Sequence, residues 1–319
     1  MYRKLNLLLI GCGKIAHDHL KCYENIKNVK IKWIYSRTPN KTKKFKNKYK
    51  SLDLEIVEDL KKFIQHNKNK IDAALVLVSP DQIFHISKLL AKNKINMFIE
   101  KPPGLNLNEI KLLTNLIQKN RLINMVGFNR RFYSNIEYLK KNEKKYGQLN
   151  GFNVECNERY WLLKKIKSNK ELKDWIYCNS SHVINLLLYF CEELHKVKTF
   201  KFKGNLPFTE KFVSILKSRN NIMGSINFFS NSPGGWKIKL YYEYVTVDLY
   251  NLEQGLIINR KFKEKIIPQN REDKIYKPGF YSQAKYFVSL IRNKEKMTKS
   301  KNDLKSSIST FQLIDEITR

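Results

Sequence analysis

The stretch that decides the fold is NLLLIGCGKIA, residues 6–16. Its apolar first half is typical of a strand buried on both faces, and its second half is a GxGxxA motif that opens a helix. Gly11 permits a tight turn, Gly13 lets the backbone approach a pyrophosphate, and Ala16 is small enough for helix and strand to pack closely. The stretch therefore predicts a dinucleotide-binding turn, although a tight strand-to-helix turn without a ligand stays open. The predicted cofactor-binding residues here are Gly11, Gly13, Lys14, Ile15 and Ala16.

Strands and helices alternate outward from this stretch over the first 127 residues. Apolar or alternating runs predict further strands at residues 29–35, 56–57, 73–78, 95–99 and 122–126. Helical spacing of apolar residues predicts helices at residues 15–26, 41–49, 60–64, 86–90 and 110–117. Strands that alternate with single helices call for right-handed crossovers and a doubly wound parallel sheet. We therefore predict that residues 1–127 form a dinucleotide-binding Rossmann domain.

The pattern changes to a period of two after residue 127. Alternating segments predict strands at residues 151–156, 197–202, 222–229, 236–249 and 256–262, and further helices are predicted at 135–144, 174–190, 281–291 and 303–317. Such strands suit a mostly antiparallel open sheet. The predicted fold class is therefore α/β, with a doubly wound Rossmann domain followed by an α+β domain. This second domain, residues 128–319, is expected to bind substrate and to mediate oligomerisation.

The end of the second predicted strand bears on the choice of cofactor. NAD-binding domains place an acidic residue there to accept a hydrogen bond from the ribose 2′-hydroxyl. This chain has Ser36 and Arg37 instead. Arg37 can hold a 2′-phosphate or stack on adenine, which favours NADP over NAD, although NAD stays possible. The alternative is that Arg37 only faces solvent.

The composition limits the kinds of partner. The formal charge is +32 over 319 residues, but the lysines are spread along the chain in the manner of an AT-rich genome, so we expect no specific nucleic acid partner. The charge can still attract an anionic substrate. No apolar run approaches the ~20 residues that span a bilayer, so we expect no membrane association. The five cysteines are scattered without a CxxC pair, which is typical of a reduced cytoplasmic protein without a disulfide framework or a metal site.

Four further segments share one family pattern with residues 11–16. They are SPDQIFH at 79–85, FIEKP at 98–102, GFNRRF at 127–132, and the Ser-His pair at 181–182 with Asn185. In this order they resemble the Gfo/Idh/MocA (glucose–fructose oxidoreductase / inositol dehydrogenase) family over nearly the whole chain. The resemblance implies an NAD(P)-dependent oxidoreductase that transfers a hydride to or from a sugar, nucleotide-sugar or polyol. It also implies a homo-oligomer, a dimer or a tetramer.

The resemblance assigns roles to individual residues. Lys101 would orient the substrate and stabilise alkoxide charge, and His182 would transfer the hydroxyl proton or form a hydrogen bond with the substrate. The alternatives are a surface lysine at a strand end and a capping or packing histidine at a helix start. His85 is expected to structure the loop after the fourth strand, and Pro102 to follow a cis bond that aims Lys101. Further cofactor-binding residues are Ser36, Arg37, Ser79, Pro80, His85, Glu100 and Lys101. Arg131 and Asn185 are expected to bind substrate. Apart from the resemblance, the aromatic faces of Tyr160, Trp161 and Trp175 could stack on a sugar ring, so these residues are also predicted to bind substrate, although they could equally be core residues.

The sequence also departs from the family pattern. Cys178 stands four residues before His182, where the family often has an aspartate, and Asn185 stands where a second aspartate is expected. Asp174 would lie about 12 Å from His182 along a helix with its ~1.5 Å rise per residue. The chain could therefore use Lys101 and His182 alone, or be a non-catalytic NADP-binding sensor of the same fold. The histidines at 17 and 19 are interpreted as surface or packing residues.

Overall fold

The computed structural model describes residues 3–167, 169–173, 175–204, 210–293 and 302–318. The chain packs into two compact units, Met1–Asn129 with Ile275–Ile308, and Arg130–Lys274 with Ser309–Arg319. The predicted division into 1–127 and 128–319 places the helix near residue 285 in the second part, whereas the packing places it in the first unit. Each unit has its own sheet.

The first unit is built on a six-stranded parallel sheet in the order β3-β2-β1-β4-β5-β6. Its strands are β1 (Leu5–Ile10), β2 (Val29–Tyr35), β3 (Glu55–Ile56), β4 (Ala73–Val76), β5 (Met97–Ile99) and β6 (Asn124–Val126). Its helices are α1 (Lys14–Glu24), α2 (Pro39–Lys48), α3 (Leu60–Asn67), α4 (Pro80–Lys92), α5 (Leu107–Lys119) and α11 (Phe280–Arg292). The strand order reverses beside β1, which confirms the predicted doubly wound sheet.

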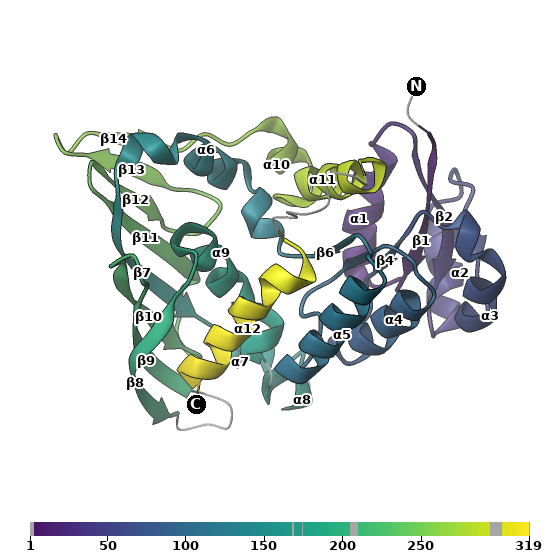
Figure 1. Cartoon of the computed structure of the whole chain (residues 1–319), viewed down its shortest axis with the longest axis horizontal. Helices are drawn as coiled ribbons and strands as arrows, with labels where there is room; N and C mark the ends of the chain where they lie inside the picture. Colours follow the sequence, from purple (N-terminus) through teal and green to yellow (C-terminus); the bar gives the residue numbers. More distant parts are fainter. Residues whose placement is uncertain (1–2, 168, 174, 205–209, 294–301, 319) are drawn as a thin grey trace. The chain divides into compact units, whose positions relative to one another are not determined.

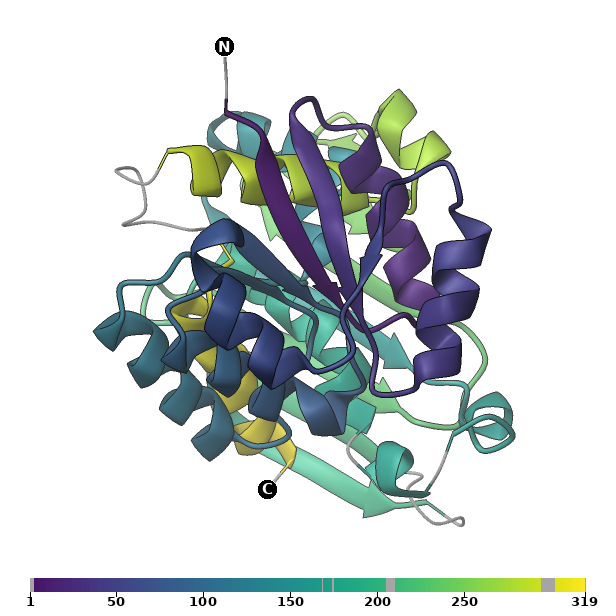
Figure 2. The same cartoon turned by 90° about the vertical axis from the view of Figure 1, so that its right-hand side faces the viewer.

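Buried apolar residues explain why this sheet forms. Residues 7–10 of β1 are at most 1% exposed and residues 73–76 of β4 are fully buried, as expected for central strands covered on both faces. α1 packs against α11, and α4 packs against α5. The sheet lies between these two helix pairs (Figure 2). Because α11 lies against α1, its apolar face belongs to the core of the first unit.

The second unit is built on an eight-stranded sheet in the order β14-β13-β12-β11-β7-β10-β9-β8. Its strands are β7 (Leu149–Asn157), β8 (His195–Lys203), β9 (Glu210–Lys217), β10 (Met223–Phe229), β11 (Trp236–Tyr242), β12 (Val245–Leu249), β13 (Leu256–Asn259) and β14 (Glu264–Ile266). Only the β7–β10 pair of this sheet is parallel, which confirms the prediction of a mostly antiparallel sheet.

Helices cover one face of this sheet. They include α6 (Ser134–Asn142), α9 (Ser181–Cys191) and the C-terminal part of α12 (Leu304–Thr318), while α7 (Tyr160–Leu163), α8 (Asn169–Lys173) and α10 (Arg271–Ile275) are short. Figure 1 shows α6 and α9 on the same side of the strands. Alternate residues of β7 face them: Phe152, Val154 and Cys156 are nearly fully buried. None of the helices in the described parts of the chain is long and apolar enough to cross a membrane.

This unit differs from the sequence predictions in four places. The strand predicted at 236–249 is a hairpin, because the backbone N–H groups of Glu243 and Tyr244 bond to the segment before β7 and turn the chain. β9 was missed because Ser214 interrupts its apolar alternation. β14 was also missed, because all of its residues are exposed and show no alternation. The helix predicted at 174–190 begins instead with a π-helical turn, Ile176–Ser180, followed by α9.

Candidate functional site

The turn between β1 and α1 is shaped by its two glycines. Gly11 has φ +106°, and a Cβ there would lie 2.3 Å from the carbonyl oxygen of Leu77, so no other residue fits without strain. Gly13 is the N-cap of α1 and has an extended conformation. A Cβ at Gly13 would meet no protein atom within 4 Å. This open space in front of a helix N-terminus fits a diphosphate, because the first-turn N–H groups have no side-chain cap.

The other residues of the turn support an anion at this position. Ala16 is fully buried, as the close packing of helix on strand requires. Lys14 is exposed as the first residue of α1, and Ile15 is partly exposed. Burial raises the pKa of the Cys12 thiol to about 11, although its hydrogen bond with Thr42 lowers it. The thiol therefore stays neutral and adds no negative charge beside the expected diphosphate.

Ser36 and Arg37 lie just past the end of β2. Arg37 is exposed, and the Ser36 hydroxyl accepts a hydrogen bond from the backbone N–H of Thr38 at 3.3 Å. Thr38 is the N-cap of α2, whose first turn contains no acidic residue. The segment therefore has the charge that a 2′-phosphate needs, and NADP binding by Arg37 stays a prediction.

Ser79 and Pro80 begin α4 at the carboxyl end of β4, as N-cap and first helical residue. His85 lies inside α4, is exposed, and contacts the ring of Phe84 with centroids 5.5 Å apart. The expectation that His85 structures the loop after the fourth strand was therefore wrong, because Pro80 starts the helix five residues earlier. Cofactor binding by these three residues stays a prediction.

Glu100 and Lys101 follow β5 at the carboxyl end of the sheet, where ligands bind in open α/β folds. Glu100 is 8% exposed, and its Oε1 lies 2.9 Å from Nε2 of His19. Its Oε2 accepts a hydrogen bond from the backbone N–H of Lys101 at 3.2 Å. Lys101 is partly exposed, and its peptide bond to Pro102 is cis, as expected.

The charge state of Glu100 follows from these contacts. Burial alone raises the pKa of the carboxyl, but the hydrogen bond and charge of His19 and the charge of Lys101 lower it more. The pKa of Glu100 therefore lies below its ordinary value. Glu100 is therefore ionised near neutral pH, and its charge attracts that of Lys101.

His19 is a functional candidate that sequence reasoning missed. It was interpreted as a surface or packing residue, yet it is 1% exposed and is the hydrogen-bond partner of Glu100. Its ring packs edge-on against Phe98, with centroids 5.0 Å apart. The signal was a polar residue in the apolar stripe of α1, since His19 shares its spacing with Ala16 and Tyr23.

His182 is the second residue of α9 in the second unit and is 5% exposed. Its ring centroid lies 6.2 Å from that of Trp236 at the start of β11. Cys178 lies in the π-helical turn before α9 and is partly exposed. Asp174, the other residue weighed for this role, lies outside the described residues.

Arg131 and Asn185, both predicted to bind substrate, contact each other. Arg131 Nε donates to Asn185 Oδ1 at 2.6 Å, and Asn185 Nδ2 donates to the Thr310 hydroxyl at 2.9 Å. Asn185 is 1% exposed, and both ends of its amide have protein partners. These contacts tie α9 to the segment after β6 and to α12, while substrate binding by either residue stays a prediction.

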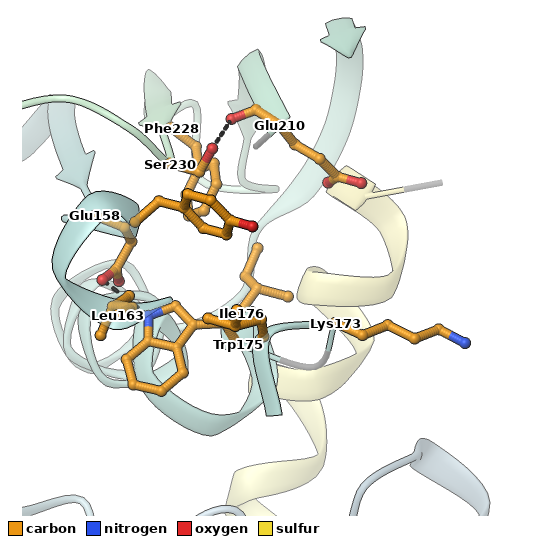
Figure 3. A pocket seen from close by; sticks show the side chains of 10 residues that line it. Glu158, Leu163, Lys173, Trp175, Ile176, Glu210, Phe228 and Ser230 are labelled. Atoms are coloured by element: carbon orange, nitrogen blue, oxygen red, sulfur yellow. Dashed lines mark hydrogen bonds between the residues drawn. The ribbon is translucent and has the colours of Figure 1, made fainter. Parts of the chain in front are cut away.

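A pocket of about 110 Å³ lies at the carboxyl ends of β7 and β10 (Figure 3). Two of the aromatic residues predicted to bind a sugar, Tyr160 and Trp175, line it, whereas Trp161 is not among its lining residues. The remaining lining residues are Glu158, Leu163, Leu172, Lys173, Ile176, Glu210, Phe228 and Ser230. The walls are mostly apolar and aromatic, which suits the apolar face of a small ligand.

Glu158 is the second residue that sequence reasoning missed. It follows β7 directly, is 6% exposed, and accepts a hydrogen bond from the Trp175 indole at 2.9 Å (Figure 3). The available signal was an acidic residue immediately after a buried strand and two residues before Tyr160. In the described parts of the chain, no group of three or more acidic, cysteine or histidine residues could hold a metal ion.

Comparisons with known proteins agree with this geometry. Residues 5–128 match the GFO_IDH_MocA model, an oxidoreductase family with an NAD-binding Rossmann fold. A glucose-6-phosphate 3-dehydrogenase from Bacillus subtilis (strain 168) is 26% identical over 136 residues, 41% of this chain and 36% of that protein. A myo-inositol 2-dehydrogenase from Thermotoga maritima is 29% identical over 134 residues, 42% of this chain and 39% of that protein. The chain thus spans less than two fifths of the length of these curated relatives.

The whole chain also resembles solved structures. A UDP-N-acetylglucosamine 3-dehydrogenase from Acidithiobacillus ferrooxidans has a TM-score of 0.79 at 13% identity, with 99% of this chain and 97% of that chain covered. At this identity the likeness shows the fold.

Proposed function

We propose, from the match of residues 5–128 to the model of the Gfo/Idh/MocA oxidoreductase family, that this chain belongs to that family and is an NAD(P)-dependent dehydrogenase. Its reaction is hydride transfer between the nicotinamide and a hydroxyl-bearing carbon of a sugar, nucleotide-sugar or polyol. One observation carries the proposal: the space in front of Gly13 is open at an uncapped helix N-terminus. That arrangement fits the diphosphate of a dinucleotide.

The proposed cofactor is NADP. The residues directly after β2 include no acidic side chain to accept a hydrogen bond from the ribose 2′-hydroxyl. Arg37 is exposed at this position instead. A guanidinium can bind a phosphate through two parallel hydrogen bonds, and the uncharged 2′-hydroxyl of NAD cannot form this paired contact. Ser36 is the second residue proposed for this contact. NAD would bind the same site more weakly.

Two residues are proposed for proton handling. When bound, the nicotinamide supplies the hydride acceptor or donor. Lys101 orients the substrate hydroxyl and stabilises the negative charge that develops on its oxygen. His182 takes the hydroxyl proton at an imidazole nitrogen during oxidation and returns it during reduction. Glu100 and His19 hold Lys101 through the contacts described above.

The proposed assembly is a homo-oligomer that uses the sheet face opposite α9. Strand pairing places Phe200, Phe202 and Met223 on that face, and they are 46%, 67% and 63% exposed. Exposed apolar side chains on an open sheet are typical of a subunit interface. Light scattering of the parent chain and of Phe200→Asp with Phe202→Asp tests this: a lower mass of the variant supports it, and equal masses contradict it.

The activity is tested with a substrate panel. Myo-inositol, glucose 6-phosphate and UDP-N-acetylglucosamine are each mixed with NADP or NAD, and formation of reduced nicotinamide is followed by its absorbance. Turnover of at least one of them, faster with NADP, is the expected result. Tight NADP binding without turnover across a broader sugar panel would contradict the enzyme and indicate a non-catalytic sensor.

A further inference from the structure

Glu158 is a buried carboxylate held by four uncharged hydrogen-bond donors. Its Oε1 accepts from the Ser180 hydroxyl at 2.7 Å and from the Trp236 indole at 3.1 Å. Its Oε2 accepts from the Trp175 indole at 2.9 Å, and the Asn179 amide donates to the two oxygens at 3.4 and 3.5 Å. A buried carboxylate is costly unless such bonds satisfy it, and hydrogen bonds to an ionised acceptor are the strong ones.

These donors come from separate elements of the second unit. Trp175 stands before the π-helical turn, Ser180 ends that turn, and Trp236 begins β11. Glu158 itself follows β7. One charge therefore ties the end of β7, both ends of the turn and the start of β11. Within the turn, the Tyr177 hydroxyl also donates to Asp315, so Glu158 is one of two carboxylates that hold this segment.

The anchored turn leads directly into His182. Ser180 is the N-cap of α9 and stands two residues before the histidine. Trp236 lies beside the His182 ring at 6.2 Å between centroids. A positive charge nearby belongs to the partly exposed Arg130, whose guanidinium carbon lies 4.4 Å from the Trp236 ring centroid. Two of the four donors of Glu158, Ser180 and Trp236, thus set the surroundings of His182.

We propose that Glu158 is the positioning residue for His182, and that it replaces the carboxylate which the family pattern places at position 178. It acts on His182 through Ser180 and Trp236. The inference rests on the proposed function, which gives His182 its role in proton transfer. If the carboxylate is lost, the turn relaxes and the imidazole leaves its working orientation.

The test uses Glu158→Gln, which keeps the shape but replaces one acceptor oxygen by a donor. The matched control is Glu155→Gln, in β7 three residues before Glu158, where the glutamate is 41% exposed and pairs with Lys237 at 2.8 Å. Histidine-labelled full-length protein is compared by NMR. The His182 ring signals should shift in Glu158→Gln, because the ring leaves Trp236, and should stay in place in Glu155→Gln. Unchanged His182 signals in Glu158→Gln would overturn the proposal.

A kinetic readout separates positioning from general damage. With whichever of myo-inositol, glucose 6-phosphate or UDP-N-acetylglucosamine the parent turns over, the single-turnover rate of Glu158→Gln should fall at least about tenfold, or about 1.4 kcal/mol of barrier. The solvent deuterium isotope effect should rise, because proton transfer becomes limiting, while NADP affinity is unchanged. A loss of active protein alone would lower the amplitude and leave the isotope effect as it was, which would contradict positioning.

Two further variants complete the design. Ser180→Ala removes one donor and leaves the Glu158 charge, so the His182 signals should shift by less than in Glu158→Gln. This variant tests the proposal even if Glu158→Gln does not fold. His182→Ala separates this inference from the proposed function. A parental rate in His182→Ala refutes the proton-transfer role itself. If the single-turnover rate falls in His182→Ala while Glu158→Gln keeps the rate of Glu155→Gln, only the positioning role of Glu158 is refuted.

Discussion

Gly13→Val is expected to abolish NADP binding while the first unit keeps its fold. The backbone at Gly13 has φ −85° and ψ −176°, which valine adopts readily. A Cβ there meets no protein atom within 4 Å, so the free energy of unfolding should fall by no more than about 1 kcal/mol, the scale of an altered N-cap. The valine methyl groups would instead occupy the space of the diphosphate.

The loss of affinity can be worked from the contacts that this displacement breaks. Each hydrogen bond from a helix N–H to a charged phosphate contributes about 1.5–3 kcal/mol. Loss of two of them weakens binding about 10²- to 10⁴-fold. The measurement is a titration of NADPH fluorescence, with thermal unfolding of the cofactor-free protein as the check on folding.

Gly11→Ala is the matched comparison in the same turn. Its φ of +106° and the 2.3 Å approach to the Leu77 oxygen add strain and overpacking of about 2–6 kcal/mol. The melting temperature should therefore drop by at least about 4 °C. Parental NADPH affinity in Gly13→Val, or a melting temperature as low as that of Gly11→Ala, would refute this account of the turn.

Three further substitutions test the remaining site residues. Arg37→Asp should weaken NADP far more than NAD, because a paired contact with phosphate becomes a repulsion, and titration of both cofactors measures the ratio. Lys101→Ala should lower turnover at least ~10²-fold with little change in NADP affinity, whereas Cys178→Ala should have a small effect in the same steady-state assay. His19→Ala should lower the free energy of unfolding by about 1–3 kcal/mol at pH 7, because Glu100 stays buried without its partner. The lowered pKa of Glu100 stabilises the folded parent protein at pH values above the ordinary glutamate pKa of about 4.3. This contribution is lost as acidification passes through the pKa of the folded state. The free energy of unfolding of His19→Ala should therefore fall less than that of the parent as the pH falls.

Each of these expectations has a contradicting result. An unchanged NADP/NAD ratio would mean that Arg37 does not bind the 2′-phosphate. Parental turnover in Lys101→Ala, or a large loss in Cys178→Ala, would move the chemistry to other residues. His17→Ala is the control for His19, since His17 is only partly buried on the same helix. Equal pH profiles of unfolding for the parent and His19→Ala would remove the His19–Glu100 pair from the account.

The sequence predicted the first unit well because its signals are local. An apolar strand, a glycine pair and a helix follow one another within residues 6–24, and the same alternation repeats along the sheet. Buried central strands show as apolar runs without any knowledge of their partners. The hairpin of β11 and β12 lacked such a signal, because hydrogen bonds to the segment before β7 set its turn.

The site was harder to predict because its key contacts are long-range. His19 and Glu100 are 81 residues apart, and Glu158 and Trp236 are 78 apart. Periodicity shows which residues are buried but not which polar groups meet. The expected distance of Asp174 from His182 assumed an ideal α-helix, whereas residues 176–180 form a π-helical turn. Glu158, which bonds to Ser180 at the end of that turn, could not be found by counting back from His182.

The most direct test of the proposed hydride transfer follows the hydride itself. The protein is incubated with NADP and with myo-inositol, glucose 6-phosphate or UDP-N-acetylglucosamine that carries deuterium on its sugar or ring carbons, and the cofactor is then examined by mass spectrometry. We expect one deuterium on the nicotinamide ring with at least one of these compounds, and a slower appearance of this deuterium with Lys101→Ala. A cofactor that binds but stays unlabelled with all of them, in the parent protein, would contradict the account.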